Sequence, residues 1–289
     1  MIRPWSRPAA TVLALLVSTS GHALPMGAHL AATVEEHGGN GFDLDFYISP
    51  TEHLTLGAGA GHATSSDASG SLAGTVLNVG LALDQDRFGV SLDYDHFGDA
   101  SNYQVGTLGA RAWFEAGDLR FALLARKRDM AVTLRLDLPR QTLSREIGFG
   151  ALGVGGQVSY LHGRFSAYGM ALAYEYDDDF ERFLEIDDGP RAERRPRLEA
   201  LLNSFVLQTQ GAIDRQAAAG CEFSLGRHAV AFDVSTLHDA VLDADSTSFG
   251  VTWRYAKSSR MDWGVTAGII DGDVSDDVAF LSVMLGLGN

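Results

Sequence analysis

The segment 249–269 reads FGVTWRYAKSSRMDWGVTAGI and decides the fold. Large apolar residues alternate with small or polar ones up to the turn at 257–260, and the same alternation resumes after it. Successive side chains of a β-strand point to opposite faces, so each half is predicted to be a strand with one apolar face. The whole segment is therefore predicted to be an antiparallel hairpin whose two faces lie in contrasting surroundings.

The same alternation recurs along the rest of the chain. A tilted strand needs about 9–11 residues to cross a bilayer, and most of the alternating segments have that length. We predict one domain of fourteen strands, with twelve as the runner-up, in which 28–36 is the weakest member. The predicted strands are 28–36, 41–49, 53–62, 72–83, 88–96, 104–114, 118–134, 145–160, 164–176, 212–225, 228–236, 247–256, 261–270 and 278–288.

The predicted connections are alternately short and long. Bacterial membrane barrels have short periplasmic turns and longer external loops. This order predicts that both termini lie in the periplasm and that the long connections lie outside the cell. The long connections are 63–71, 97–103, 135–144, 177–211, 237–246 and 271–277.

The first residues have the pattern of a secretory signal. Arg3 and Arg7 give a basic start, 10–17 is an apolar core, and small residues precede a cleavage site after Ala23. We therefore predict a signal peptide at 1–23 and a barrel at 24–289. Nothing later in the sequence approaches the roughly eighteen uninterrupted apolar residues of a spanning helix, so a helical membrane protein is excluded.

Composition limits the function classes. The chain has 289 residues, a formal net charge of −15 and 33 glycines but only 7 prolines. Nucleic-acid binding requires a basic surface, so that class is excluded. The negative charge instead suits divalent cations or cationic solutes, and glycine suits the curved wall of a barrel.

The export signal, the alternation and the loop asymmetry together resemble the Gram-negative outer-membrane β-barrel class over about residues 28 to 289. The resemblance implies an all-β, transmembrane, antiparallel up-and-down barrel in the cell outer membrane. Its expected partners are outer-membrane lipid and lipopolysaccharide. One departure is the C-terminus, because such barrels usually end in an aromatic residue and this chain ends Leu287-Gly288-Asn289.

Charged residues of both signs share the parity of the inward face. Such residues line a water-filled passage with a transverse field, or they pair with one another and close a narrow interior. Both alternatives remain open from the sequence. The predicted lining residues are Asp43, Asp45, Asp93, Asp95, Arg111, Arg120, Arg126, Glu222, Asp233, Arg254 and Asp262.

Acidic residues gather in the predicted external loops, in the runs 177–179, 243–245, 271–273 and 276–277. Carboxylate oxygens are hard ligands that suit Ca²⁺, but none of these runs has the EF-hand spacing. We expect no cofactor and at most loosely bound Ca²⁺ at these loops. The simpler interpretation is a set of solvated loops that divalent ions bridge to lipopolysaccharide.

The longest connection, 177–211, differs from the others in kind. An acidic run is followed by an arginine-rich run, and Pro196 then opens a segment with apolar residues at helical spacing. We predict a short amphipathic helix at about 196–209 that covers the mouth or folds into the lumen. The alternative is a continuing external strand.

Two predicted strand ends carry residue types used in hydrolysis. Asp95 and His96 lie at one outer end, and Ser235, His238 and Asp239 lie at another. A histidine with a carboxylate can activate a serine or a water molecule. No Gly-x-Ser-x-Gly or His-Glu-x-x-His motif accompanies them, so we predict that the protein is not an enzyme.

Three functions remain in order of preference. The first is a passive, porin-like channel or uptake pore for small polar or cationic solutes, gated by 177–211. The second is a closed structural or surface-binding barrel with acidic external loops. The third is an outer-membrane hydrolase that uses His96 or His238. The sequence leaves the solute, the oligomeric state and the open or plugged state of the lumen undetermined.

Overall fold

The structure is a computed structural model that describes residues 26–36, 39–67, 70–99, 103–138, 141–177, 212–240, 243–258, 260–272 and 275–288. The predicted signal peptide at 1–23 and the predicted helix at 196–209 lie outside these ranges. Within them, no helix is long and apolar enough to cross a membrane.

All described secondary structure is β-strand. The strands are β1 (Met26–Glu35), β2 (Asn40–Thr51), β3 (Leu54–Asp67), β4 (Gly70–Gln85), β5 (Phe88–Asp99), β6 (Tyr103–Ala116), β7 (Leu119–Leu138), β8 (Gln141–His162), β9 (Phe165–Tyr176), β10 (Ile213–Leu225), β11 (His228–Asp239), β12 (Ala244–Ser258), β13 (Met261–Gly272) and β14 (Ser275–Gly288).

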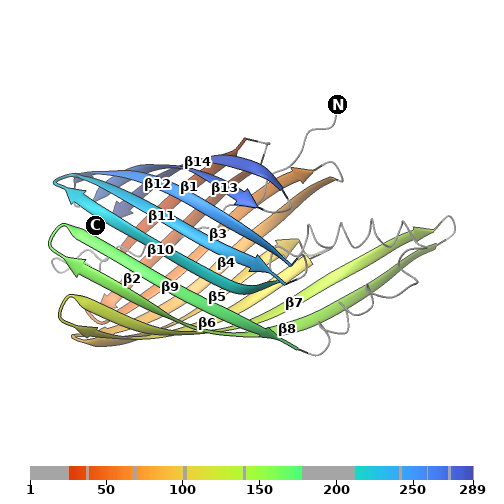
Figure 1. The fold of residues 1–289 in the computed structure, drawn as a ribbon, viewed down its shortest axis with the longest axis horizontal. Coiled ribbons are helices and arrows are strands. Elements are labelled where there is room, and N and C mark those ends of the chain that lie inside the picture. The colour runs from red at the N-terminus through yellow and green to blue at the C-terminus, as the bar shows by residue number, and fades with distance from the viewer. Residues whose placement is uncertain are drawn as a thin grey trace.

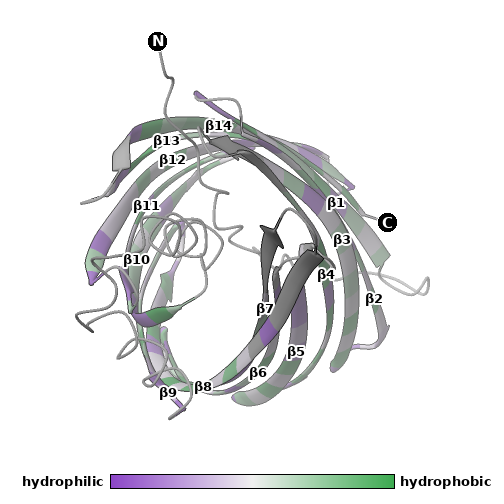
Figure 2. Ribbon diagram, turned by 90° about the vertical axis from the view of Figure 1, so that its right-hand side faces the viewer, coloured by the Kyte–Doolittle hydropathy of each residue, from purple (hydrophilic) through white to green (hydrophobic). Residues whose placement is uncertain are grey.

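The strands form one closed barrel in which each strand pairs antiparallel with its neighbours in the sequence (Figures 1 and 2). The barrel closes where β1 pairs with β14 as well as β2, with Gly27 opposite Gly288 and Glu35 opposite Phe280. Closure gives every strand a partner on both sides over the height that the strands share, so no sheet edge faces the lipid.

The fourteen predicted strands are confirmed, and the weakest of them, 28–36, is the closing strand β1. Five of the six predicted long connections, all except 177–211, are mostly strand in the structure, and the longest such extensions lie at 63–71 and 135–144. The ladder of β3 and β4 continues to Asp67 opposite Gly70, so most of 63–71 is strand. The ladder of β7 and β8 continues to Leu138 opposite Gln141, so most of 135–144 is strand as well. A strand that extends beyond the lipid needs no apolar face, so the alternation did not reveal these extensions.

The long hairpin of β7 and β8 projects beyond the other strands on the side of the long connections (Figure 1). These two strands contain 20 and 22 residues, against 12 in β9. The barrel wall is therefore much taller on one side than on the other.

The outer surface carries a continuous band of exposed apolar side chains. Leu123 is 74% exposed, and Val154 and Phe46 are also more than half exposed. On β7 the outer face becomes charged above this band, where Lys127 and Asp129 form an ion pair of 3.2 Å. Such an exposed apolar surface requires lipid around it, so the strands cross a membrane.

Aromatic side chains ring the band at the end of the short turns. Trp263 packs edge-on against Trp253 at 4.8 Å between ring centroids, and it also contacts Tyr255. On β9 and β10, beyond the intervening β11, Phe165 packs against Phe223 at 4.8 Å. Tryptophan and tyrosine prefer the lipid–water interface, so this collar marks one membrane boundary.

Candidate functional site: the inner wall of the barrel

The inner wall is formed by the residues that alternate with the apolar residues of the outer band and therefore point to the opposite face. On β2, Phe42 and Phe46 are exposed outward, so the intervening Asp43 and Asp45 point toward the barrel axis. The same parity turns the rest of the eleven predicted residues inward: Asp93 and Asp95 on β5, Arg111 on β6, Arg120 and Arg126 on β7, Glu222 on β10, Asp233 on β11, Arg254 on β12 and Asp262 on β13.

Glycines of the neighbouring strand lie beneath several of these carboxylates. Asp45 packs over its register partner Gly59, and Asp93 packs over its partner Gly109. A β-carbon at Gly109 would lie 2.7 Å from the Asp93 carboxylate carbon, which is too close for two carbon atoms. The inner glycines therefore let the acidic side chains lie flat along the wall.

Inner aromatic side chains use glycine in the same way. The Tyr174 ring covers Gly153, where a β-carbon would lie 2.6 Å from the ring. Trp113 covers Gly89 on the strand beside it. Aromatic cover of a strand glycine restores the packing that the missing side chain gives up.

The wall formed by β9 to β13 pairs its polar groups internally. Glu222 and Arg254 form a half-buried ion pair, with side-chain exposures of 27% and 19%. The Tyr168 hydroxyl donates a hydrogen bond of 2.9 Å to Asp233. Two hydroxyl pairs complete this set, Ser235 with Ser248 at 2.7 Å and Thr252 with Thr266 at 2.8 Å.

The wall formed by β6 and β7 is rich in arginine. Arg120 pairs with Glu115, and both Arg120 and Arg111 lie over the Trp113 ring, at 5.8 and 5.6 Å from its centroid. Higher on β7, Arg128 lies 5.4 Å from the centroid of Tyr174. A guanidinium over an aromatic face gains electrostatic attraction without an anionic partner.

Several of these inner residues were not named from the sequence. Arg128 continues the parity of Arg120 and Arg126 within the predicted strand 118–134, so the same alternation identifies it. Glu115 lies just beyond the predicted strand 104–114, whereas β6 continues to Ala116. Tyr174 could not be linked to Arg128 from the sequence, because their contact depends on the register of β7, β8 and β9.

The structure does not assemble the two sets of residues considered for hydrolysis. Asp95 and His96 are consecutive in β5 and therefore point to opposite faces of the wall. Ser235 bonds Ser248 on the inner face, whereas His238 contacts carboxylates. Neither set brings a hydroxyl group to a histidine.

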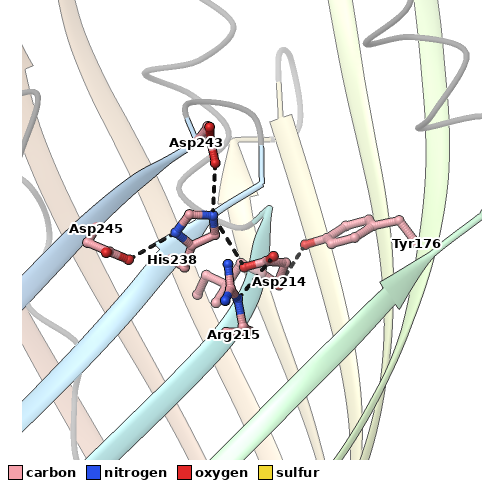
Figure 3. A network of polar contacts seen from close by, with 7 residues as sticks. Tyr176, Asp214, Arg215, His238, Asp243 and Asp245 are labelled. Carbon is pink, nitrogen blue, oxygen red and sulfur yellow. Dashed lines mark hydrogen bonds and ion pairs between the residues drawn. The ribbon is translucent and has the colours of Figure 1, made fainter.

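His238 is instead the centre of an acidic cluster at the end of the barrel where β10, β11 and β12 meet (Figure 3). Its Nδ1 shares a hydrogen bond of 2.9 Å with Asp245, and its Nε2 lies 3.4 Å from Asp243 and 4.0 Å from Asp214. Arg215 contacts Asp214 from the other side at 3.4 Å. The cluster joins three strand ends through charge.

The surroundings of His238 raise its pKa. The side chain is 16% exposed and lies beyond the apolar band, past Thr236 on the same face of β11. The hydrogen bond with Asp245 raises its pKa above the usual 6.5, and the charge of Asp214 adds to this effect, while desolvation and Arg215 oppose it. His238 therefore binds its second imidazole proton more tightly in the folded protein than in the unfolded chain.

Part of the predicted calcium-binding loops contributes to this cluster. Asp243 and Asp245 belong to the acidic run 243–245, and both contact His238. Among the residues with described positions, no group of three or more His, Cys, Asp or Glu side chains is placed to hold a metal ion. Loosely bound Ca²⁺ at the loops stays a prediction.

Comparison with known proteins gives the fold. No family model and no curated protein matches the sequence. Among solved structures, the loop L8 deletion mutant of OmpT, an outer membrane protein of Vibrio cholerae, aligns with a TM-score of 0.52 and 10% identity over 92% of this chain and 98% of that chain. Outer-membrane expressed OmpT of Vibrio cholerae aligns with a TM-score of 0.51 and 10% identity, over 94% and 99% of the two chains.

The fold and its surface define the class of the protein. A closed antiparallel barrel with an apolar outer band and an aromatic collar is built to cross a membrane, and in bacteria such barrels reside in the outer membrane. The chain is an outer-membrane β-barrel of fourteen strands. At 10% identity the matched structures carry the argument no further than this shared fold.

Proposed function

We propose that the protein is a passive outer-membrane channel for small polar or cationic solutes. The observation that carries this proposal is the inner wall, where charged side chains of both signs are partly exposed beside glycines. Asp93, Asp95, Arg126 and Arg128 form no ion pair within 4.0 Å among the described residues, and unpaired charges of this kind favour a water-filled lumen over an interior closed by paired charges.

The size of the barrel supports a passage. Barrels of about eight strands are filled by their own side chains, whereas those of about sixteen to eighteen strands hold an aqueous channel. Fourteen strands place this barrel near the wider group. The eleven predicted lining residues include seven carboxylates and four arginines, which favours cations over anions.

The proposal is tested by osmotic swelling of liposomes that contain the refolded barrel. Entry of small neutral sugars, at rates that fall as the sugar becomes larger, is the result expected of a passive channel. Liposomes that stay impermeable to every sugar, both with the full barrel and after deletion of 190–210, would refute it, provided that gel migration before and after boiling shows the protein to be folded.

The second candidate is a closed structural or surface-binding barrel. The observation in its favour is the wall of β9 to β13, whose polar groups pair with one another instead of facing a solute. A closed barrel would leave the liposomes impermeable and would remain so after deletion of 190–210. Swelling that begins only after that deletion would instead identify a plugged channel.

A further inference from the structure

Two acidic and two basic residues lie near one another on one inner wall of the barrel, close to the level at which the outer face of β7 becomes charged. Asp93 and Asp95 lie on the inner face of β5, and Arg126 and Arg128 lie on the inner face of β7. Strands β5, β6 and β7 are consecutive in the wall (Figure 2). The two acidic and the two basic residues are therefore separated by a single strand.

The register places the charges in two parallel rows. Asp93 is opposite Gly109 of β6, and Gly109 is opposite Arg126. Two residues further along the strands, Asp95 is opposite Thr107 of β6, and Thr107 is opposite Arg128. Since neighbouring strands lie about 4.8 Å apart, the acidic and basic backbones are roughly 10 Å apart. Only small side chains lie between them.

The four charged side chains do not form close ion pairs with described residues. Among the residues that the structure describes, no ion pair within 4.0 Å involves Asp93, Asp95, Arg126 or Arg128. Asp95 and Arg126 interact electrostatically over a longer distance. All four residues are partly exposed, so a solute in the lumen can reach them.

Apolar residues border the charges along the strands. Val105 and Met130 form the next row of the inner wall and are 5% and 2% exposed. On the other side, Leu124 precedes Arg126 on the same face of β7. Low-dielectric borders concentrate the field between opposite charges, so the field across Gly109 is stronger than it would be on an open surface.

We propose that this constellation is a binding subsite for small zwitterions that carry both an ammonium and a carboxylate group, such as free amino acids. The inference rests on the proposed channel and names a solute class for it. The ammonium group binds the carboxylates of Asp93 and Asp95, while the planar forks of Arg126 and Arg128 bind the carboxylate. A neutral molecule of the same size gains neither contact.

Alanine and lactamide provide the test, because they are similar in size but only alanine is zwitterionic. Liposomes containing the refolded barrel are transferred to isotonic solutions of each solute, and the swelling rates are compared. We expect alanine to enter about fivefold faster than lactamide, the effect of two solvated charge contacts. The variants R126Q/R128Q and D93N/D95N should each reduce the ratio to about one.

Lys127→Gln is the matched control. It also removes a positive charge from β7, but Lys127 points outward and pairs with Asp129, so the ratio should stay unchanged. Folding of each variant is checked by gel migration without boiling. If one double variant fails to fold, the other still tests the site, because each removes one half of it.

The possible outcomes separate the subsite from the channel. If lactamide enters and alanine enters no faster, the subsite is overturned and the channel stays intact. The same conclusion holds if alanine enters faster but both double variants keep this difference. Impermeability to both solutes would overturn the channel itself.

Discussion

Replacement of Gly155 by alanine is expected to destabilise the barrel. Gly155 lies on the inner face of β8 opposite Leu172 of β9. A β-carbon there would lie 2.8 Å from the Leu172 α-carbon and 2.9 Å from its Cδ1, and closer still to the carbonyl oxygen of Ala171. Two of these three atoms belong to the backbone of the ladder, so they cannot rotate away. Leu172 is only 3% exposed and has no space to retreat.

The magnitude follows from two opposing effects. Overpacking of this kind costs about 1–3 kcal/mol. Replacement of glycine by alanine restricts the unfolded chain, which returns about 0.4–1 kcal/mol. The net loss for Gly155→Ala is therefore about 1–2 kcal/mol. At Gly169 on the adjacent strand β9, a β-carbon meets no atom within 4 Å, so Gly169→Ala is expected to be neutral or slightly stabilising.

The two variants are compared by guanidinium unfolding in detergent micelles, followed by tryptophan fluorescence. The midpoint should fall for Gly155→Ala and should stay or rise for Gly169→Ala. Equal midpoints for the two variants would refute the packing of β8 against β9 from which the difference is derived.

Three further outcomes are expected. Arg254→Met leaves half-buried Glu222 without its partner and should lower the free energy of unfolding by about 1–3 kcal/mol, less than the loss expected for a fully buried pair. In guanidinium unfolding, E222Q/R254M should recover part of this loss, and a double variant as unstable as the single variant would argue against the pair. Because the folded-state pKa of His238 is raised, its contribution to stability is complete below the unfolded value of 6.5 and is lost as the pH rises through the folded value. The melting-temperature difference between wild type and His238→Gln should therefore shrink from about pH 5.5 to about pH 8.5, and a constant difference would contradict the cluster. Fluorescence of Trp253 and Trp263 should be quenched more by lipids brominated near the headgroup than near the chain end, and the reverse order would displace the collar from the interface.

The number and faces of the strands were predictable because two physical constraints coincide. Strand side chains alternate with a period of two, and lipid requires the outer set to be apolar. The hairpin of β12 and β13 shows both constraints over its whole length. Even 28–36, the least certain segment, has the alternation that lets it close the barrel as β1.

The strand extensions of β3, β4, β7 and β8 were not predictable in this way. Outside the lipid both faces of a strand meet water, so polar sequence such as that of 135–144 is compatible with either a loop or a ladder. Only the continued pairing of β7 with β8 distinguishes the two.

Each charged residue could be assigned to one face of its own strand from the sequence, but its partners could not be assigned. Asp93 was assigned to the inner face from its own strand, whereas its position over Gly109 and across from Arg126 depends on two registers. Alternation excludes a register shift of one residue, but it does not distinguish registers that differ by two residues, which turn geometry and loop length decide. The cluster around His238 was missed for the same reason, because its members come from three strands.

The most direct test of a channel is the conductance of the refolded protein in a planar bilayer, with the reversal potential measured under a salt gradient. We predict stable conductance steps and a reversal potential on the cation-selective side, since carboxylates outnumber arginines among the predicted lining residues. Absence of any steps, both from the full barrel and after deletion of 190–210, from protein shown to be folded and inserted, would contradict the channel.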